Sequence, residues 1–398
     1  MSIPMQFPGL FSLIILLTDD NPAHTEQGLA VACSLSDITG AEIASFSVPK
    51  LKGLRRFIAG KRKVQLLTGR REETLSWLNY AKGGTLLHSV SALFKQRKIK
   101  DNSSKTIIIS AGSETAAYNL AVASAWNVAC SVIGNPEGVG TKPFEFVIIP
   151  EYEKQPAEPN ILKIVTPPNN IGGKELDEKA KALLEKRKAD GSRIWPLLVG
   201  GSGADNSMDP EKLRLLAAKL ACRAEACGMQ IYAGTSSRTD RKCLAVLQKL
   251  AEQNEAVHCL LPEEYGEDLH YALMGITDPV FCTEDLFGEI SEAVTADRKV
   301  VLLRTACTKG LKQKISRLTG RLVENGALQR FRAHGTARNN MVYDRFKRHG
   351  KLQEFENWLL YCGTKETPSS GLDGETSVWR NFNEARRAAK WIAESLAE

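Results

Sequence analysis

The sequence predicts an α/β protein built from two doubly wound, Rossmann-like domains that follow one another along the chain. Its 398 residues exceed what one ordinary core needs and suit two domains. Short apolar runs typical of strands alternate with helix-type runs throughout, which requires mostly parallel sheets covered by helices. This alternation pauses once, around residues 166–190, and then begins again.

The first domain is predicted over residues 1–165. Its first apolar run, "GLFSLIILL" at 9–17, is shorter than the roughly 20 residues of a membrane span and follows no basic residue. We therefore interpret it as a buried first strand. A helix-type run that ends on a glycine comes next. The strand-type segments after it are "EIASFSV", "TIIIS", "VACSVIG" and "FEFVIIP".

Residues 166–190 begin with Pro-Pro, Asn-Asn and Gly-Gly and become a charged helical run, so we predict a linker. The strand–helix pattern returns over residues 191–330, the second domain. Its strand-type segments are "RIWPLLVGG", "MQIYAG", "VHCLL", "DPVFCTE" and "KVVLLR". Residues 331–398 are expected to form an irregular segment and a closing amphipathic helix at roughly 380–397.

Composition indicates a soluble globular protein and gives no sign of a metal-binding or disulfide-rich one. With 43% hydrophobic and 25% charged residues, the chain has the balance of a soluble globular protein. The nine cysteines are scattered without a C-x-x-C pair, and the six histidines form no metal-binding pattern. We therefore expect free thiols in a reducing compartment, no structural metal and no cofactor.

Residues 50–71, "KLKGLRRFIAGKRKVQLLTGRR", hold nine basic residues and no acidic one, with apolar residues in between. Such a segment is typical of binding to an anionic membrane surface. Nucleic acid is a weaker alternative, because the segment has few aromatic residues and the chain has no nucleic-acid fold signature. A solvated helix face is the third interpretation.

Ligands of doubly wound sheets bind beyond the carboxyl ends of the strands. Three loops of the second domain leave those ends: residues 200–207, 234–239 and 283–293. Glycines and hydroxyl groups near a helix start, with one arginine, suit a diphosphate. Polar turns are also the default for this fold. The candidates are Gly200, Gly201, Ser202, Gly203, Thr235, Ser236, Arg238, Thr283 and Glu292.

The first domain presents its own polar groups at the corresponding edge. His24 lies between a strand and a helix, where it is a candidate proton acceptor, with Asp19 as the second choice. A lone histidine is more often structural, and loop polarity or helix capping explains the rest equally well. The further candidates on this edge are Gln27, Gly112, Ser113 and Glu151.

Taken in order, the segments "LIILLTDDNPAHTEQGLAVA", "IIISAGSETAAYNLAVA", "FEFVIIPEYEKQPAEPNIL", "WPLLVGGSGADNSMDPEKLRLLAAKL", "IYAGTSSRT" and "DPVFCTEDLFGEISEAVTADRKVVLL" resemble the mitochondrial-fission ELM protein family. The resemblance spans about residues 12–325.

Three motifs depart from that family's pattern. The usual D-G-x-x-G-H-x-x-Q start keeps Asp19, His24 and Gln27 but has Asp20 and Ala23 in place of its glycines. The usual P-E-H-D motif is Pro-Glu-Tyr-Glu at 150–153. The hydroxyl-rich part of T-x-D-S-x-S-M-x-S-E-A is replaced by Leu-Phe-Gly-Glu at 286–289, which removes the expected hydroxyl contacts to a phosphate.

The family is similar to two-domain GT-B glycosyltransferases, which implies a cleft between the domains and a last helix that crosses back to the first. By this resemblance the second domain holds a nucleotide-diphosphate sugar, and Glu292 accepts hydrogen bonds from the ribose hydroxyls. The first domain holds an acceptor at a membrane, with His24 or Asp19 as base. Such an enzyme needs no metal when N–H groups and Arg238 offset the diphosphate charge.

The alternative is a non-catalytic, membrane-associated or partner-binding protein on the same scaffold, because a fold does not fix a function. Plant family members are linked to organelle fission, and the missing glycines favour this interpretation. The first residues are neither Arg-rich nor Ser-rich, unlike a mitochondrial transit peptide. We therefore expect a bacterial protein of the cytoplasm, peripheral at the inner membrane.

Overall fold

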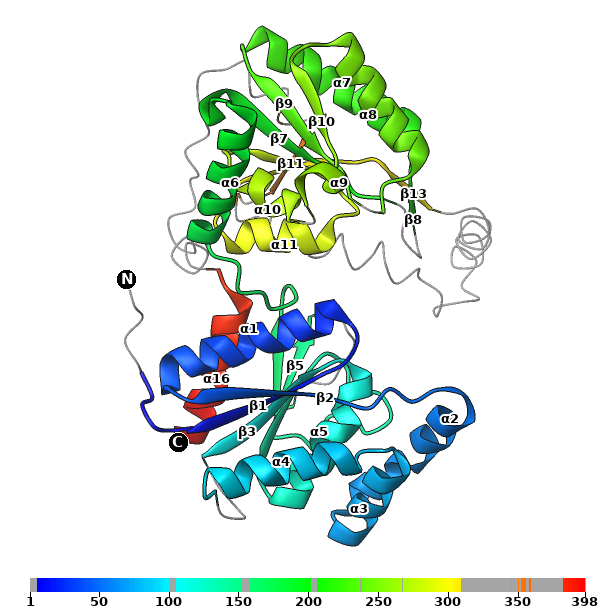
Figure 1. Ribbon diagram of the computed structural model, residues 1–398, viewed down its shortest axis with the longest axis vertical. Helices are drawn as coiled ribbons and strands as arrows, with labels where there is room; N and C mark the ends of the chain where they lie inside the picture. Colours follow the sequence, from blue (N-terminus) through cyan, green and yellow to red (C-terminus); the bar gives the residue numbers. More distant parts are fainter. Residues whose placement is uncertain are drawn as a thin grey trace. The chain divides into compact units, whose positions relative to one another are not determined.

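The computed structural model describes residues 6–99, 105–151, 158–201, 206–236, 238–266, 268–308, 345, 350, 352–355, 358 and 382–397 (Figure 1). The chain divides into two compact units. Unit 1 is Met1–Asn170 with Asn383–Glu398, and unit 2 is Ile171–Phe382. Each unit is an α/β domain with its own six-stranded sheet.

Unit 1 has a fully parallel sheet in the order β2-β1-β3-β4-β5-β6. Leu13 of β1 is in register with Glu42 of β2 and Thr106 of β3. The elements are β1 (Leu13–Thr18), α1 (Pro22–Thr39), β2 (Glu42–Ser47), α2 (Gly53–Arg62), the 3-10 helix η1 (Lys63–Thr68), α3 (Arg71–Tyr80), α4 (Gly84–Gln96), β3 (Thr106–Ala111), α5 (Ser113–Trp126), β4 (Ala129–Ile133), β5 (Phe146–Pro150), β6 (Ile161–Ile164) and α16 (Glu384–Ala397).

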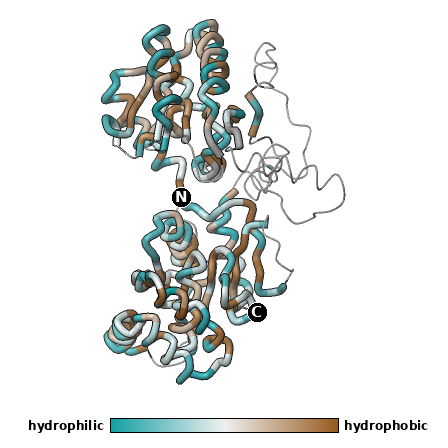
Figure 2. Tube along the Cα trace, turned by 90° about the vertical axis from the view of Figure 1, so that its right-hand side faces the viewer, coloured by the Kyte–Doolittle hydropathy of each residue, from teal (hydrophilic) through white to brown (hydrophobic). Residues whose placement is uncertain are grey.

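Helices cover both faces of the unit 1 sheet, so β1 is buried on both sides. Leu13, Ile15 and Leu17 pack with side chains of α3, α4 and α5. Ile14 and Leu16 point to the other face, which α1 and α16 cover. This alternation explains why the first strand reads as an unbroken apolar run. Figure 2 shows the apolar segments in the interior and the polar ones outside.

Unit 2 has a parallel sheet in the order β10-β9-β7-β11-β12-β14 and a small antiparallel pair of β8 with β13. Its elements are α6 (Gly173–Arg187), η2 (Gly191–Arg193), β7 (Ile194–Leu198), β8 (Asn206–Met208), α7 (Pro210–Ala226), β9 (Gln230–Gly234), α8 (Arg241–Gln253), β10 (Val257–Leu260), α9 (Pro262–Tyr265), α10 (Leu269–Met274), β11 (Val280–Thr283), α11 (Phe287–Thr295), β12 (Val300–Leu303), β13 (Ala306–Thr308) and β14 (Leu352–Glu354).

The segment predicted as a linker, residues 166–190, is mostly helix α6 of unit 2. Leu176, Ala180 and Leu183 are buried on this helix, and a Cβ on Gly275, after α10, would lie 2.0 Å from the Leu176 carbonyl oxygen. The charged surface of α6 concealed this apolar stripe, whose three- and four-residue spacing is that of a packed helix. The chain passes between units near residues 170 and 382, so only the first part of this segment connects them.

The strand orders confirm the predicted fold class, two doubly wound α/β domains, and the closing helix α16 returns to unit 1 as expected. In each sheet the strand order reverses at one point: between β1 and β3 in unit 1, and between β7 and β11 in unit 2. The loops beyond the carboxyl ends of these strands are the places where such folds bind ligands. Among the described helices, none is long and apolar enough to cross a membrane.

Candidate functional site

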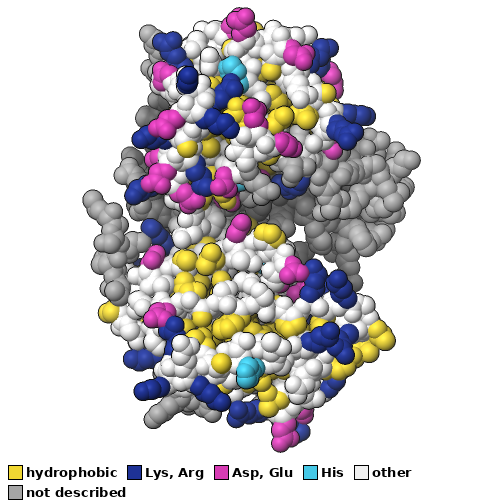
Figure 3. All heavy atoms as spheres, viewed as in Figure 1, with side chains coloured by type: hydrophobic (Ala, Val, Ile, Leu, Met, Phe, Trp, Pro, Cys, Tyr) yellow, Lys and Arg dark blue, Asp and Glu magenta, His cyan; other side chains and the backbone are white. Residues whose placement is uncertain are grey.

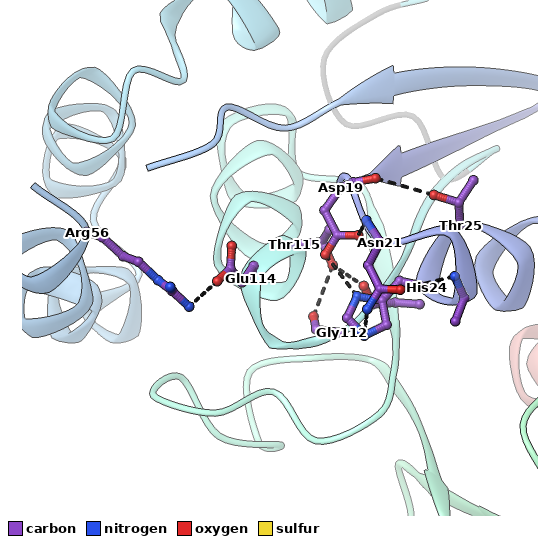
Figure 4. Close-up of polar contacts among 10 residues, drawn as sticks. Asp19, Asn21, His24, Thr25, Arg56, Gly112, Glu114 and Thr115 are labelled. Carbon is purple, nitrogen blue, oxygen red and sulfur yellow. Dashed lines mark hydrogen bonds and ion pairs between the residues drawn. The ribbon is translucent and has the colours of Figure 1, made fainter. Parts of the chain in front are cut away.

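His24 and Asp19 form a hydrogen-bonded pair at the switch point of unit 1 (Figure 4). The His24 Nδ1 atom lies 2.9 Å from Asp19 Oδ2, and the side chains are 31% and 13% exposed. Asp19 follows β1, and His24 lies in the first turn of α1. The sequence offered the two residues as rival bases, whereas the structure joins them. The sites predicted from sequence meet here in one acid–base pair.

Neighbouring contacts fix which imidazole nitrogen of His24 carries the proton. Asn21 caps α1, and its Oδ1 already accepts the Ala23 N–H at 3.1 Å. The Asn21 amide therefore donates through Nδ2 to His24 Nε2, at 3.3 Å. Nδ1–H then donates to Asp19, and Nε2 keeps the lone pair. A carboxylate that orients an imidazole in this way is the arrangement of a general base.

Gly112 makes room for the imidazole at the end of β3. Its φ of +88° lies in a region that favours glycine. A Cβ at this position would lie 2.5 Å from both Cε1 and Nδ1 of His24, closer than non-bonded atoms approach. The predicted acceptor-side residue Gly112 is therefore in direct contact with the predicted base. Any side chain here displaces His24.

The remaining acceptor-side candidates lie at the same carboxyl edge of the unit 1 sheet. Ser113 begins α5 directly after Gly112, and Gln27 lies one turn after His24 on α1. Glu151 follows β5, two strands along from β3, and its N–H donates to the Ile164 carbonyl at 2.8 Å. Their part in binding an acceptor stays a prediction.

Unit 2 holds a cavity of ≈ 480 Å³ at the carboxyl ends of β7, β9 and β11, which is within the range of small-molecule sites. It adjoins the switch point between β7 and β11. Its wall is mixed, with apolar side chains, two carboxylates, a histidine and an arginine. The lining residues are Leu198, Val199, Gly234, Thr235, Ser236, Arg238, Pro262, Glu263, His270, Leu273, Leu286 and Glu289.

Three predicted donor-side residues, Thr235, Ser236 and Arg238, line this cavity. Glu289, which the sequence did not single out, lines it as well. The Arg238 Nη2 atom lies 3.5 Å from Glu289 Oε1, and the Arg238 side chain is 58% exposed. The signal for Glu289 was its place in the first turn of α11, directly after the β11 loop. Arg238 thus places a solvent-exposed cation in the wall of the cavity.

Gly200 and Gly201 are required by the packing of three loops. A Cβ on Gly200 would lie 2.0 Å from Asp285 Oδ2, and one on Gly201 would lie 1.8 Å from the Arg238 carbonyl oxygen. The Gly200 N–H donates to Thr283 Oγ1 at 3.0 Å, which gives buried Thr283 a structural contact. The loops after β7, β9 and β11 are therefore locked together. Ser202 and Gly203, also predicted here, lie outside the described residues.

Asp285 holds this junction from the loop after β11. Its Oδ2 atom accepts the Gly201 N–H at 2.7 Å. Burial raises the pKa of the Asp285 carboxyl above its ordinary value, although hydrogen bonds such as that from Gly201 oppose the shift. The carboxyl is therefore costly to ionise, and it acts as an anchor for the Gly200–Gly201 backbone.

Glu292, predicted to bind the ribose, lies one turn beyond Glu289 on α11. It is half-buried, and its Oε1 atom accepts a hydrogen bond from the Tyr271 hydroxyl at 3.2 Å. The residues that line the cavity include Glu289 and leave Glu292 out. The ribose role of Glu292 stays a prediction, and Glu289 is a second carboxylate to weigh beside it.

A family model described as mitochondrial fission ELM1 matches residues 24–396, nearly the whole chain. The chain belongs to the mitochondrial fission ELM1 family. A search of curated proteins gave no match.

Solved structures with a similar backbone share little sequence with this ELM1-family chain. A UDP-GlcNAc 2-epimerase from Methanocaldococcus jannaschii has 14% identity and a TM-score of 0.45, over 83% of this chain and 91% of that one. An ADP-heptose heptosyltransferase II from E. coli has 11% identity and a TM-score of 0.39, over 73% and 83%. A UDP-forming trehalose-phosphate synthase from Burkholderia vietnamiensis has 11% and 0.40, over 97% and 98%. With sequence identities and TM-scores this low, these structures do not indicate which ligand this chain binds.

The glycines that this ELM1-family member lacks are not required by its first loop. Asp20 and Ala23 are absent from the described residues with positive φ, so each adopts a backbone that any residue tolerates. Asp20 is exposed and pairs with Lys50 at 2.7 Å. The replacements therefore leave the His24–Asp19 pair intact.

Among the described residues, no group of three His, Cys, Asp or Glu side chains is placed to hold a metal ion. Of the described residues that line the unit 2 cavity, Arg238 is the one arginine or lysine. The expectation of a reaction without metal or cofactor stays a prediction.

Proposed function

We propose that this ELM1-family chain is a glycosyltransferase that moves a sugar from a nucleotide-diphosphate donor to a membrane-associated acceptor. The observation that carries the proposal is the unit 2 cavity at the strand-order switch, with Arg238 in its wall. The His24–Asp19 pair at the other switch point supplies the base that the reaction needs. Both sites lie where doubly wound folds bind ligands.

In unit 2 the donor diphosphate is the natural partner of Arg238. A phosphate oxygen that replaces Glu289 at the guanidinium forms a charge-assisted hydrogen bond. The first turn of α11, which reaches the cavity at Leu286 and Glu289, adds free N–H groups that favour an anion. Glu289 is then free to accept hydrogen bonds from the ribose hydroxyls. Binding of the donor thus exchanges one carboxylate partner for a diphosphate.

In unit 1 the acceptor hydroxyl gives its proton to His24 Nε2 as its oxygen attacks the anomeric carbon of the sugar. The bond from that carbon to the phosphate oxygen breaks, and the nucleoside diphosphate leaves with the electron pair. Asp19 stabilises the imidazolium through Nδ1–H. To reach Nε2 the hydroxyl replaces the Asn21 amide, whose contact is long at 3.3 Å. The weak hydrogen bond from the Asn21 amide is thereby replaced by a stronger one from the acceptor hydroxyl.

The first test is calorimetry and thermal unfolding of the full chain with UDP, GDP, ADP, CMP and their sugars. A ligand at 100 times its Kd stabilises a protein by about 2.7 kcal/mol. Arg238→Ala is expected to weaken the binding of the preferred nucleotide by about tenfold to a hundredfold, because hydrogen bonds to charged groups contribute about 1.5–3 kcal/mol.

The matched control is Arg214→Ala, an arginine of unit 2 on α7 that pairs with Glu211 and does not line the cavity. It should bind nucleotide as the unchanged chain does. With the donor known, sugar transfer to lipid extracts is measured for His24→Ala, which should bind donor normally and turn over little. A folded protein that no nucleotide stabilises would remove the basis of the transferase proposal.

A non-catalytic, membrane-associated or partner-binding protein is the second candidate function. It is favoured by one observation, the four apolar side chains that residues 50–71 expose to solvent. An anionic membrane surface remains the proposed partner of this segment in both functions. If vesicle binding persists while no nucleotide binds, the second function replaces the first.

A further inference from the structure

Helix α2 and the following turn η1 expose large apolar side chains. The exposed fractions are 73% for Leu54, 62% for Phe57, 62% for Val64 and 50% for Leu67. In the described part of the chain seven large hydrophobic residues are at least 42% exposed, and the four most exposed of them fall within residues 54–67. Single exposed apolar residues need no explanation, but a concentration of this kind marks an interaction surface. We call residues 50–71 the α2–η1 surface.

This surface is held firmly on unit 1, so its exposed apolar side chains are not the result of a frayed end. The buried Trp77 of α3 donates its indole N–H to the Ala59 carbonyl at 3.0 Å. Ala59 and Leu66 are buried beneath the surface and anchor it. Leu54 and Phe57, spaced three apart, share one face of α2, as Val64 and Leu67 do on the next turns. The anchors and the exposed residues therefore lie on different faces.

Charge on the α2–η1 surface has a single sign. Its nine basic residues exceed the net charge of the whole chain, +7, so the remaining residues carry a net −2. Lys61 Nζ lies 5.6 Å from the ring centre of Phe57, next to the apolar face. In Figure 3 blue and yellow side chains gather together at the right-hand edge of unit 1, over α2. Apolar and basic groups thus face solvent side by side.

Three occupants compete for such a surface. A second copy docked face to face would bring two clusters of nine positive charges together, which opposes a symmetric dimer. Single-stranded nucleic acid uses aromatic platforms, and Phe57 is the one aromatic residue between 50 and 71. An anionic bilayer satisfies both features, because its acyl region takes the apolar side chains and its headgroups take the cations.

We propose that the α2–η1 surface docks on an anionic membrane, with Leu54, Phe57, Val64 and Leu67 inserted below the headgroups. This deepens the proposed membrane partner by naming the inserted side chains, and it does not depend on sugar transfer. Arg56 of α2 pairs with Glu114 in the first turn of α5, beside Gly112 and the His24–Asp19 pair (Figure 4). The docked helix is thereby joined to the candidate catalytic edge.

Flotation of the full chain with vesicles of phosphatidylcholine alone, or mixed equally with phosphatidylglycerol, tests the proposal. The chain should float with the mixed vesicles and not with phosphatidylcholine alone. Leu54→Ser combined with Phe57→Ser keeps every charge and should lower the fraction bound by about tenfold or more. Leu29→Ser combined with Leu215→Ser is the matched control, since both leucines are exposed elsewhere, and it should bind normally.

A direct readout of insertion comes from Phe57→Trp. Its emission, taken as the difference from the unchanged chain with its six tryptophans, should shift to the blue and be quenched by brominated lipid on binding. Binding by charge alone would leave the Leu54→Ser, Phe57→Ser variant unaffected at low salt, which overturns insertion. Flotation without a change in the Trp signal places the contact elsewhere and also overturns it.

A dimer that the same two substitutions dissociate would assign the surface to a second copy. Nucleotide binding by this variant should be unchanged, which separates the outcome from that of the transferase proposal.

Discussion

The two units show how one fold makes two different kinds of site. In unit 1 the strands follow the local order 2-1-3-4-5-6, and in unit 2 the order 3-2-1-4-5-6, yet both reverse beside their first strand. At the unit 1 reversal the chain's own His24 fills the space over Gly112 and is fixed by Asp19. At the unit 2 reversal a cavity of ≈ 480 Å³ stays open. Unit 1 therefore presents an imidazole held in place by its neighbours, and unit 2 presents an open cavity.

Glycines mark both reversals but for different physical reasons. Gly112 lacks a side chain so that a side chain of the site, His24, has room. Gly201 lacks one so that two loop backbones approach closely, because a Cβ there would overlap the Arg238 carbonyl. Substitution in unit 1 should therefore disturb the chemistry, and substitution in unit 2 should disturb the fold of the site.

The largest effect is expected from Asp19→Asn in unit 1. Loss of the carboxylate removes the group that holds His24 with its proton on Nδ1, and general-base catalysis contributes about 10²–10⁴-fold. We expect kcat to fall about a hundredfold or more, with the Kd for donor unchanged. Long-range proton–nitrogen spectra should also show the neutral imidazole changing from the Nδ1–H form to a mixture. A normal spectrum and a normal kcat would mean that the pair is structural only.

Gly201→Ala in unit 2 should lower the free energy of unfolding by about 2–4 kcal/mol, since its Cβ overlaps backbone that cannot turn aside. Chemical denaturation followed by circular dichroism measures it. Gly288→Ala is the control within the same unit: its Cβ meets nothing within 4 Å, and alanine stabilises a helix by about 0.5–1 kcal/mol. Equal effects of the two substitutions would refute the loop-junction argument.

A smaller effect separates the two carboxylates of α11. Glu289→Gln replaces the cavity-lining carboxylate by an amide, a weaker acceptor for the ribose hydroxyls. Nucleotide affinity should therefore fall by about threefold to tenfold, in line with one hydrogen bond. Glu292→Gln keeps an acceptor for the Tyr271 hydroxyl and should change affinity less. Isothermal titration of both variants decides between them. The reverse order would restore Glu292 as the ribose partner that the family resemblance implies.

The smallest effect is expected when the two family glycines are restored. Asp20→Gly with Ala23→Gly should leave turnover and donor binding unchanged, because both positions have an ordinary backbone and the Asp20 carboxylate pairs with Lys50. Kinetics of the double variant test this directly. A gain in activity of tenfold would show that the replacements had impaired the site.

The sequence by itself determined the fold class and the position of the candidate loops. The apolar run of β1 and the repeated helix periods are local properties. Residues two apart in a strand share a face, and so do residues three or four apart in a helix. From this order alone, the carboxyl ends of the strands fall at one edge of each sheet. For that reason the sequence alone could single out His24, Asp19, Gly112 and Arg238 as candidates.

Only the tertiary structure decided which of these residues meet. Whether His24 pairs with Asp19, whether Glu289 or Glu292 lines the cavity, and why Gly201 carries no side chain all depend on distances between loops far apart in sequence. The same holds for α6, a charged helix whose apolar stripe is buried because it packs beside α10. On α2–η1 the period revealed apolar residues, but burial of Ala59 and Leu66 instead of Leu54 and Phe57 follows from packing on unit 1. Periodicity assigns a residue to a face, and only the neighbouring elements determine whether that face is core, site or surface.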